Sequence, residues 1–240
     1  MPRLITGLDA VKIRTNVERI REEIGPGPKI LAAVKYVPLE ELGTLAEAGL
    51  TLLGENRAQD LEAKATAHPE YRWHFIGQLQ SRKVKQIVPY VELIHSVASE
   101  SALRQLERHG DPDTEILLEV NVAGEESKAG ISPEALGEYI ARSPVPVKGL
   151  MTMPPFTTNP EESRPYFARL RELAAEHDLA ELSMGTSQDY KVAAEEGATI
   201  VRLGTILYAV LIGPLSQALL PAFLVAPTKS DVSDLPEVGT

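Results

Sequence analysis

The chain has 240 residues, of which 43% are hydrophobic and 24% charged, as in ordinary globular proteins. Its 24 basic and 34 acidic residues give a net charge of −10, so it lacks the overall basic character of nucleic-acid-binding proteins. It contains no cysteine, which excludes a disulfide scaffold, a cysteine-ligated metal site and a thiol nucleophile. This composition fits a cytoplasmic protein, and we expect no nucleic-acid partner.

Eight short apolar runs, typical of buried parallel strands, alternate with amphipathic stretches of helical period. The runs cover residues 29–34, 50–53, 73–76, 91–95, 115–121, 146–150, 181–184 and 199–203. The helical stretches cover 8–23, 39–48, 55–67, 80–87, 99–109, 132–142, 160–177 and 187–196. Ser99 and Ser132 are the expected caps of two of these helices, the second with proline at the first helical position.

This alternation predicts an α/β fold, a single closed (β/α)₈ TIM barrel, over residues 1–208. An open doubly wound sheet is the alternative. The turn after the first strand reads VKYVPLEE and has no G-x-G-x-x-G phosphate loop, which weighs against a dinucleotide-binding domain.

The segment 209–226, AVLIGPLSQALLPAFLVA, is about long enough to span a bilayer as a helix. Gly213, Pro214 and Pro221 interrupt it, so we expect a bent segment that packs on the barrel or on a partner. A membrane helix is the alternative. Residues 209–240 would then form a C-terminal segment that ends in a polar tail. The N-terminal residues have no apolar core of signal-peptide length, and we expect no membrane association.

In a barrel of this kind, functional residues lie where the strands end. Lys35 follows the first strand and would point into the barrel mouth. Desolvation and nearby positive charge lower the pKa of such an amine, and a neutral amine can form a Schiff base with an aldehyde. The alternative is a lysine whose head group reaches solvent.

Two glycine-containing loops, SMGTS after the seventh strand and RLGT after the eighth, are candidates for a phosphate site. The hydroxyls of Thr186, Ser187 and Thr205 and the backbone N–H groups could donate to phosphate oxygens. Ser187 is also expected to begin a helix, whose N-terminal dipole favours an anion. The alternative is two glycine turns and a helix cap.

Arg202 lies inside the last strand and needs a partner if it points inward. It could face a pyridine nitrogen and keep it unprotonated, or form a salt bridge with an acid. His74 and His95 show no zinc-binding spacing, so we expect no metal and two hydrogen-bonded core histidines. The basic run 81–85, SRKVK, is typical of a solvated helix face, although it could contact phosphate or nucleic acid.

At these residues the sequence resembles the pyridoxal phosphate homeostasis proteins, the YggS/PROSC family. The resemblance covers about residues 8–208 and departs at ILYAVLIGPLSQ, where the family usually has IFGER. It depends on seven blocks in order: AAVKYVP around Lys35, GENRAQD at 54–60, WHFIGQLQSRK at 73–83, HSVAS at 95–99, NVAGEESKAGI at 121–131, GLMTMPP at 149–155 and LSMGTSQDYKVAAEEGATIVRLGTILY at 182–208.

The resemblance implies a barrel similar to the N-terminal domain of alanine racemase, with pyridoxal 5′-phosphate (PLP) as cofactor. It implies that Lys35 holds the Schiff base, that Arg202 faces the pyridine nitrogen, and that Lys128 acts in cofactor exchange or positioning. Ser187, Gly204 and Thr205 would hold the phosphate and Ser183 would orient Arg202. The remaining cofactor-binding residues would be Asn56 and Met151 beside the ring, and Gly185 and Thr186, which shape the phosphate loop.

Racemization needs an acid or base on each face of the substrate. In the racemases the second group is a tyrosine from the partner's C-terminal β-domain, which we expect this chain to lack. We therefore expect a monomer or weak dimer that binds PLP for intracellular homeostasis and delivery to apo-enzymes, with little or no catalysis. The alternatives are a small racemase, in which Tyr36, Tyr190 or Tyr208 supplies the acid, and an interaction module formed by residues 209–226.

Overall fold

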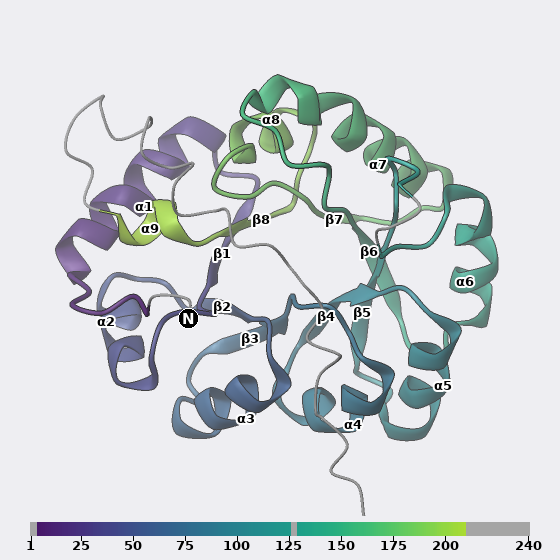
Figure 1. The fold of residues 1–240 in the computed structure, drawn as a ribbon, viewed down its shortest axis with the longest axis horizontal. Helices are drawn as coiled ribbons and strands as arrows, with labels where there is room; N and C mark the ends of the chain where they lie inside the picture. Colours follow the sequence, from purple (N-terminus) through teal and green to yellow (C-terminus); the bar gives the residue numbers. More distant parts are fainter. Residues whose placement is uncertain (1–3, 126–128, 210–240) are drawn as a thin grey trace, which may run out of the picture. The chain divides into compact units, whose positions relative to one another are not determined.

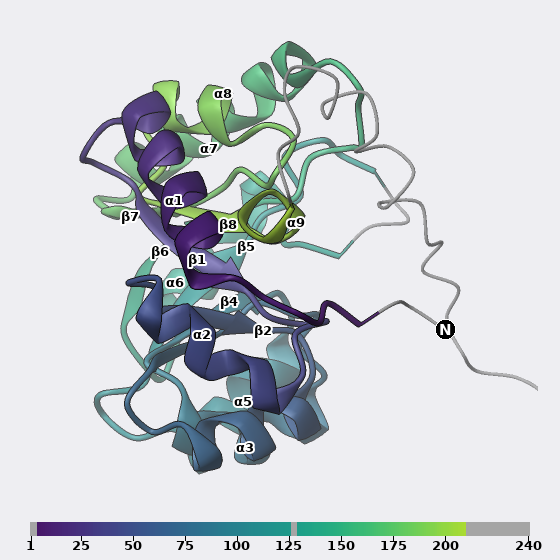
Figure 2. The same cartoon turned by 90° about the vertical axis from the view of Figure 1, so that its left-hand side faces the viewer.

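The computed structural model, which describes residues 4–125 and 129–209, contains eight parallel strands that close into a barrel (Figures 1 and 2). The strands are β1 (Lys29–Ala33), β2 (Leu52–Glu55), β3 (Arg72–Phe75), β4 (Leu93–Val97), β5 (Glu115–Glu119), β6 (Val147–Met151), β7 (Glu181–Ser183) and β8 (Ile200–Leu203). Each strand pairs with its neighbour in chain order, and β8 pairs with β1, with Leu31 opposite Arg202. The closed barrel predicted from the sequence is confirmed, and the open sheet is wrong.

Helices follow the strands and surround the barrel on its outer side (Figure 1). They are α1 (Ala10–Ile24), α2 (Leu42–Glu47), α3 (Ala58–Ala67), α4 (Val84–Ile87), α5 (Glu100–His109), α6 (Leu136–Arg142), α7 (Arg164–Glu176), α8 (Tyr190–Glu195) and α9 (Thr205–Tyr208). Short 3₁₀ turns extend several of them: η1 (Leu39–Glu41), η2 (Ser81–Lys83), η3 (Val88–Tyr90), η4 (Pro133–Ala135) and η5 (Pro160–Ser163).

Several helix starts differ from the prediction. The helix expected from residue 55 begins at Ala58, because Glu55 is the last residue of β2. The helix expected from Ser187 begins at Tyr190, after a turn. Ser99 caps α5 by accepting the N–H of Ala102 as predicted, whereas Ser132 makes no capping bond to the backbone.

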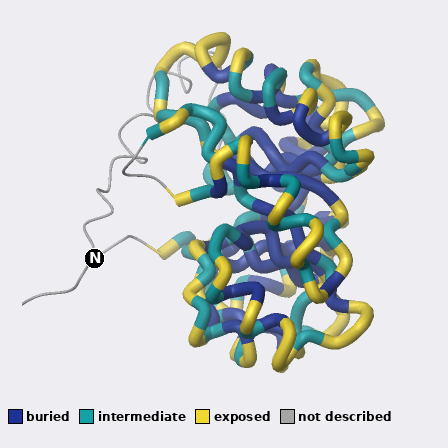
Figure 3. Tube along the Cα trace, turned by 90° about the vertical axis from the view of Figure 1, so that its right-hand side faces the viewer, coloured by how far each residue is buried: buried dark blue, intermediate teal, exposed yellow. Residues whose placement is uncertain are grey.

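The barrel wall separates two apolar clusters, because successive side chains of a strand point to opposite faces. In β8, Ile200 belongs to a cluster inside the barrel, whereas Val201 and Leu203 belong to the larger cluster that includes the helices. Figure 3 shows the buried segments in the interior and the exposed ones along the outer surface. The strands therefore fix which residues face the barrel interior, and their ends define its rim.

The predicted C-terminal segment lies beyond the part of the chain that the structure describes, which ends at residue 209. The proposed packing of residues 209–226 and the interaction module therefore fall outside the described residues. Within the described ranges, no helix is long and apolar enough to cross a bilayer.

Candidate functional site

Lys35 follows β1 at the rim of the barrel. β1 ends at Ala33, and the N–H of Val34 still donates to the carbonyl oxygen of Gly54 on β2 at 2.9 Å. The Lys35 side chain is half-buried, and its Nζ lies 5.0 Å from the centroid of the Tyr36 ring. The structure thus places this amine where the strands end, next to an aromatic face.

A buried ion pair between β2 and α3 supports this rim. Oε2 of Glu55 and Nζ of Lys64 are 2.6 Å apart, and both side chains are buried. Lys64 also donates to the carbonyl oxygen of Val34 at 2.7 Å, while Glu55 Oε1 accepts the backbone N–H of Asn56 at 2.6 Å. The pair thereby connects the backbone beside Lys35 to that of Asn56, two residues predicted to bind the cofactor.

The two predicted phosphate loops meet at the same end of the barrel. The Gly204 N–H donates to Ser187 Oγ at 3.2 Å, and Thr205 follows directly as the first residue of α9. A Cβ placed on Gly204 would lie 3.8 Å from the Cβ of Ala33, which is two residues before Lys35. The ends of β7, β8 and β1 therefore bring the glycine-containing loops and the lysine together.

Asp189 holds the loop after β7 in place. Its Oδ1 accepts the Thr186 N–H at 2.7 Å and the Thr186 hydroxyl at 3.1 Å, and its Oδ2 accepts the Ser163 hydroxyl at 3.0 Å. The Thr186 proton is therefore directed at Asp189 in this structure, and its donation to a phosphate stays a prediction. Gly185 has a φ of +88°, and a Cβ there would lie 2.5 Å from that of Ala193, so this position requires glycine.

Arg202 is buried in β8, and its guanidinium is bound by neutral acceptors rather than by the acid that the sequence left as an alternative. Nη1 donates to the carbonyl oxygen of Ser183 at 2.7 Å and to its Oγ at 2.5 Å. Nη2 donates to the carbonyl oxygen of Thr152 at 2.9 Å and contacts Met153 Sδ at 2.8 Å. The contact between Ser183 and Arg202 that the resemblance implied is therefore present.

A chain of hydrogen bonds runs from Arg202 across the barrel interior. Arginine can only donate, so Ser183 Oγ accepts from Arg202. His95 Nδ1, 2.8 Å away, is the acceptor that gives the buried Ser183 proton a hydrogen bond. Neutral His95 then carries its proton on Nε2 and donates to His74 Nδ1 at 2.9 Å. His74 Nε2 is 4.0 Å from Glu92 on the other side. One donor-only group thus sets both histidine tautomers.

The protonation states agree with this direction. Burial lowers the pKa of His74 to about 4, and burial, with the nearby His74 and Arg202, lowers that of His95 well below its ordinary value. Burial also lowers the pKa of Arg202 to about 10, against the attraction of Asp189 and Glu119. At neutral pH both histidines are therefore neutral and Arg202 is charged. The expectation of two buried, hydrogen-bonded histidines is confirmed.

The remaining residues predicted to bind the cofactor lie at the rim, in the interior or outside the described part of the chain. Asn56 is half-buried at the rim, and Met151 is buried in the cluster inside the barrel. Lys128 lies outside the described residues. Sequence reasoning missed Glu55, Lys64 and Asp189. GENRAQD and SMGTSQDY contain two of them, but no periodicity pairs Glu55 with a lysine nine residues later.

The three candidate tyrosines occupy different places. The Tyr190 hydroxyl donates to Glu23 on α1, outside the barrel wall, so its suggested role as an acid at the mouth is wrong. The Tyr208 hydroxyl donates to the carbonyl oxygen of Ala33 at 3.2 Å, and burial raises its pKa above the ordinary value. Tyr36 adjoins Lys35.

Comparisons with known proteins identify the family. A family model described as the N-terminal domain of alanine racemase matches residues 8–211. A pyridoxal phosphate homeostasis protein from Aquifex aeolicus is 42% identical, over 82% of this chain and 94% of the relative. Its counterpart from Pseudomonas aeruginosa is 36% identical, over 82% and 92%. The chain belongs to the pyridoxal phosphate homeostasis protein family. The resemblance read from the sequence is confirmed.

Solved structures agree with this assignment. PipY of Synechococcus elongatus PCC7942, solved with PLP bound, is 31% identical, with a TM-score of 0.73 over 82% of this chain and 100% of PipY. Its structure without PLP has a TM-score of 0.76 at 32% identity, with the same coverage. A lysine/ornithine decarboxylase from Vibrio vulnificus, 18% identical with a TM-score of 0.64 over 83% of this chain and 62% of that one, shows a shared fold alone.

Proposed function

We propose that the chain binds PLP at the rim formed by β1, β7 and β8, with Lys35 as the Schiff-base lysine. The observation that carries this proposal is the meeting of the two glycine-containing loops beside β1. Gly204 contacts Ser187 through a hydrogen bond and approaches Ala33, two residues before Lys35. The names of the family's members and the PLP-bound PipY structure support it.

The donor groups fit such a cofactor. PLP supplies an aldehyde that reacts with an amine, a pyridine ring that can withdraw electrons, and a phosphate. Lys35 supplies the amine. The Ser187 hydroxyl accepts the Gly204 N–H, and its own proton remains for a phosphate oxygen. The Thr205 hydroxyl and backbone groups would complete the phosphate site.

Arg202 would define the chemical character of the site. Its guanidinium stays charged at neutral pH and cannot give a proton to a ring nitrogen, so a pyridine beside it would remain unprotonated. An unprotonated ring is a weak electron sink, which suppresses carbanion chemistry. The Ser183, Thr152 and Met153 contacts fix Arg202 before any ligand arrives.

We therefore propose a carrier rather than a catalyst, a barrel over residues 1–208 that holds PLP reversibly and delivers it to apo-enzymes. Covalent attachment at Lys35 would keep the reactive aldehyde from other amines until it is released. The cysteine-free sequence fits a reducing compartment, and we propose a cytoplasmic monomer or weak dimer.

An absorbance titration with PLP tests this proposal. Wild-type protein is expected to develop an imine band, and borohydride reduction followed by peptide mapping should place the pyridoxyl group on Lys35. Lys35→Ala should lose the band, while Lys29→Ala, a neighbouring exposed lysine on β1, should keep it. An imine that persists in Lys35→Ala, or a wild-type protein that forms none, would reject Lys35 as the attachment site.

A racemase is the second candidate function, favoured by the contact between Tyr36 and Lys35. It predicts loss of deuterium from the α-carbon of amino acids, faster than with free PLP and dependent on Tyr36. The racemase is rejected if Tyr36→Phe leaves the rate of deuterium loss unchanged, or if a broad panel of amino acids shows no deuterium loss. The carrier then remains as the proposed function.

A further inference from the structure

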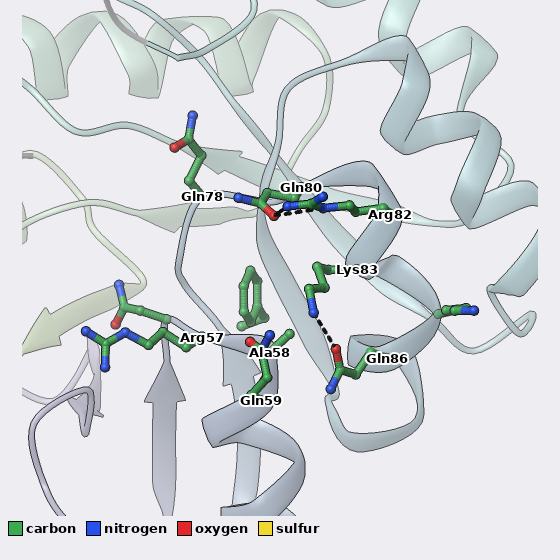
Figure 4. A pocket seen from close by; sticks show the side chains of 11 residues that line it. Arg57, Ala58, Gln59, Gln78, Gln80, Arg82, Lys83 and Gln86 are labelled. Carbon is green, nitrogen blue, oxygen red and sulfur yellow. Dashed lines mark hydrogen bonds between the residues drawn. The ribbon is translucent and has the colours of Figure 1, made fainter. Parts of the chain in front are cut away.

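A cavity of about 630 Å³ lies outside the barrel wall, between α3, η2 and α4. Small-molecule sites usually have volumes of about 300–1,000 Å³. Figure 4 shows how side chains from these elements surround it. It is lined by Asn56, Arg57, Ala58, Gln59, Phe75, Gln78, Gln80, Arg82, Lys83, Lys85 and Gln86.

The chemistry of this lining is unlike that of the whole chain. It contains four cations, five side-chain amides, one phenyl ring and one alanine, and no carboxylate, although the chain carries a net charge of −10. Arg57 precedes α3, whereas Arg82, Lys83 and Lys85 come from η2 and α4, so positive charge reaches the cavity from two elements. The run SRKVK, which suggested a solvated helix face, thus contributes Arg82, Lys83 and Lys85 to the lining of this cavity.

Two of these cations are held in place by uncharged partners. Arg82 donates to the amide oxygen of Gln80 at 3.3 and 3.4 Å, and Lys83 donates to that of Gln86 at 3.1 Å (Figure 4). Amide oxygens accept hydrogen bonds but carry no negative charge that could offset the positive charge of the cation. Arg57 pairs with Asp60 at 3.4 Å, but both side chains are exposed, and such pairs contribute little.

Phe75 of β3 also lines the cavity, but it belongs to the cluster outside the barrel and is only 2% exposed. The cations and amides therefore supply the groups that a ligand would contact. Arg and Lys are the side chains that bind phosphate oxygens best, because their hydrogen bonds are charge-assisted.

We propose that this cavity is a second, non-covalent site for a small phosphate monoester whose organic part carries polar groups that the amides can bind. The site is distinct from the proposed PLP site, because Lys35, Ser187, Arg202 and Gly204 do not line it. Asn56 is common to the lining and to the predicted cofactor residues, so the two sites are neighbours. A nucleotide and a phosphorylated form of vitamin B6 share this chemistry.

Calorimetric titration of the full-length protein with AMP and, separately, pyridoxine 5′-phosphate tests the proposal, since neither can form an imine. Binding is expected for at least one, with adenosine, pyridoxine and inorganic phosphate each weaker. The double variant Arg82→Gln/Lys83→Gln should weaken binding about tenfold or more. A loss of this size corresponds to at least one charge-assisted hydrogen bond. The ester that binds more tightly shows whether the ligand is a nucleotide or a phosphorylated form of vitamin B6.

Two matched variants separate binding in this cavity from general charge attraction and from binding at the proposed PLP site. Lys12→Gln/Arg21→Gln removes the same charge from the exposed side of α1 and should leave binding within about twofold. Ser187→Ala/Thr205→Val should impair PLP uptake but leave the binding that depends on Arg82 and Lys83. A thermal melt checks that each variant is folded.

Three results would overturn the inference. These are no binding of either ester at millimolar concentration, equal binding by wild type and Arg82→Gln/Lys83→Gln, or tighter binding of a single-stranded oligonucleotide than of AMP, which would indicate a polymer instead. None of them bears on the imine at Lys35, so this inference and the proposed PLP site can fail separately.

Discussion

The barrel interior contains two regions of opposite character. One is an apolar cluster, to which Leu93 of β4 and Ile200 of β8 belong. The other is the hydrogen-bonded chain that includes His95 of β4 and Arg202 of β8, each two residues further along the same strand. Both regions are buried, yet an apolar side chain needs only close neighbours, whereas each buried polar group needs a partner in the right direction. The polar chain therefore serves orientation more than stability.

The largest expected effect is in the apolar region. Leu117→Ala removes a fully buried side chain from the interior cluster and should lower the free energy of unfolding by about 3–5 kcal/mol, because the closed wall cannot collapse onto the cavity. Urea denaturation measures this. Val11→Ala, at an exposed position of α1, is the control. A loss below about 1 kcal/mol would mean that the interior is loosely packed.

The second prediction is a pH dependence of stability that belongs to the polar region. The pKa of His74 is about 4 in the folded protein and near 6.5 in an unfolded chain, so between these values the unfolded chain binds the extra proton. The free energy of unfolding should therefore fall as pH drops from 6.5 to 4, by about 3 kcal/mol from His74. His95 acts in the same direction.

His74→Gln should flatten this slope, whereas His109→Gln, at an exposed position of α5, should keep it. Urea midpoints measured between pH 7 and pH 4.5 provide the comparison. Identical slopes in wild type and His74→Gln would show that His74 takes up its proton over the same pH range in the folded and unfolded states, contrary to a pKa lowered by burial.

The third prediction concerns a substitution in the middle of the hydrogen-bonded chain. His95→Leu keeps the volume but leaves the Ser183 hydroxyl proton without an acceptor and His74 Nδ1 without a donor, which should cost about 2 kcal/mol. His95→Gln, which can still accept and donate, should cost less. The Leu variant should also weaken PLP uptake, because His95 no longer holds the Ser183 hydroxyl in the position from which it accepts from Arg202. Unchanged uptake in a folded variant would separate the chain from the cofactor site.

The sequence predicted the strands well, because a strand that is covered on both faces leaves a local apolar run. It placed Lys35 and the glycine-containing loops at the strand ends for the same reason. It could not predict contacts between distant residues, such as the bond from Ser183 to His95, 88 positions apart. It also extended the helix α3 back to Glu55, which is the last residue of β2. Glu55 pairs with Lys64 of α3, and the local sequence pattern does not show that the two residues belong to different elements.

The smallest predicted effect lies at the outer end of the polar chain, where the interior meets solvent. Glu92 is 4.0 Å from His74 Nε2 and pairs with Arg72, and the side chains of Glu92 and Arg72 are 47% and 54% exposed. Exposed pairs contribute little, so Glu92→Gln should change the free energy of unfolding by less than about 0.5 kcal/mol and leave PLP uptake unchanged. A loss as large as that of His95→Leu would mean that the tautomers are set from Glu92. A small loss means that they are set from Arg202, the end at which we propose that PLP binds.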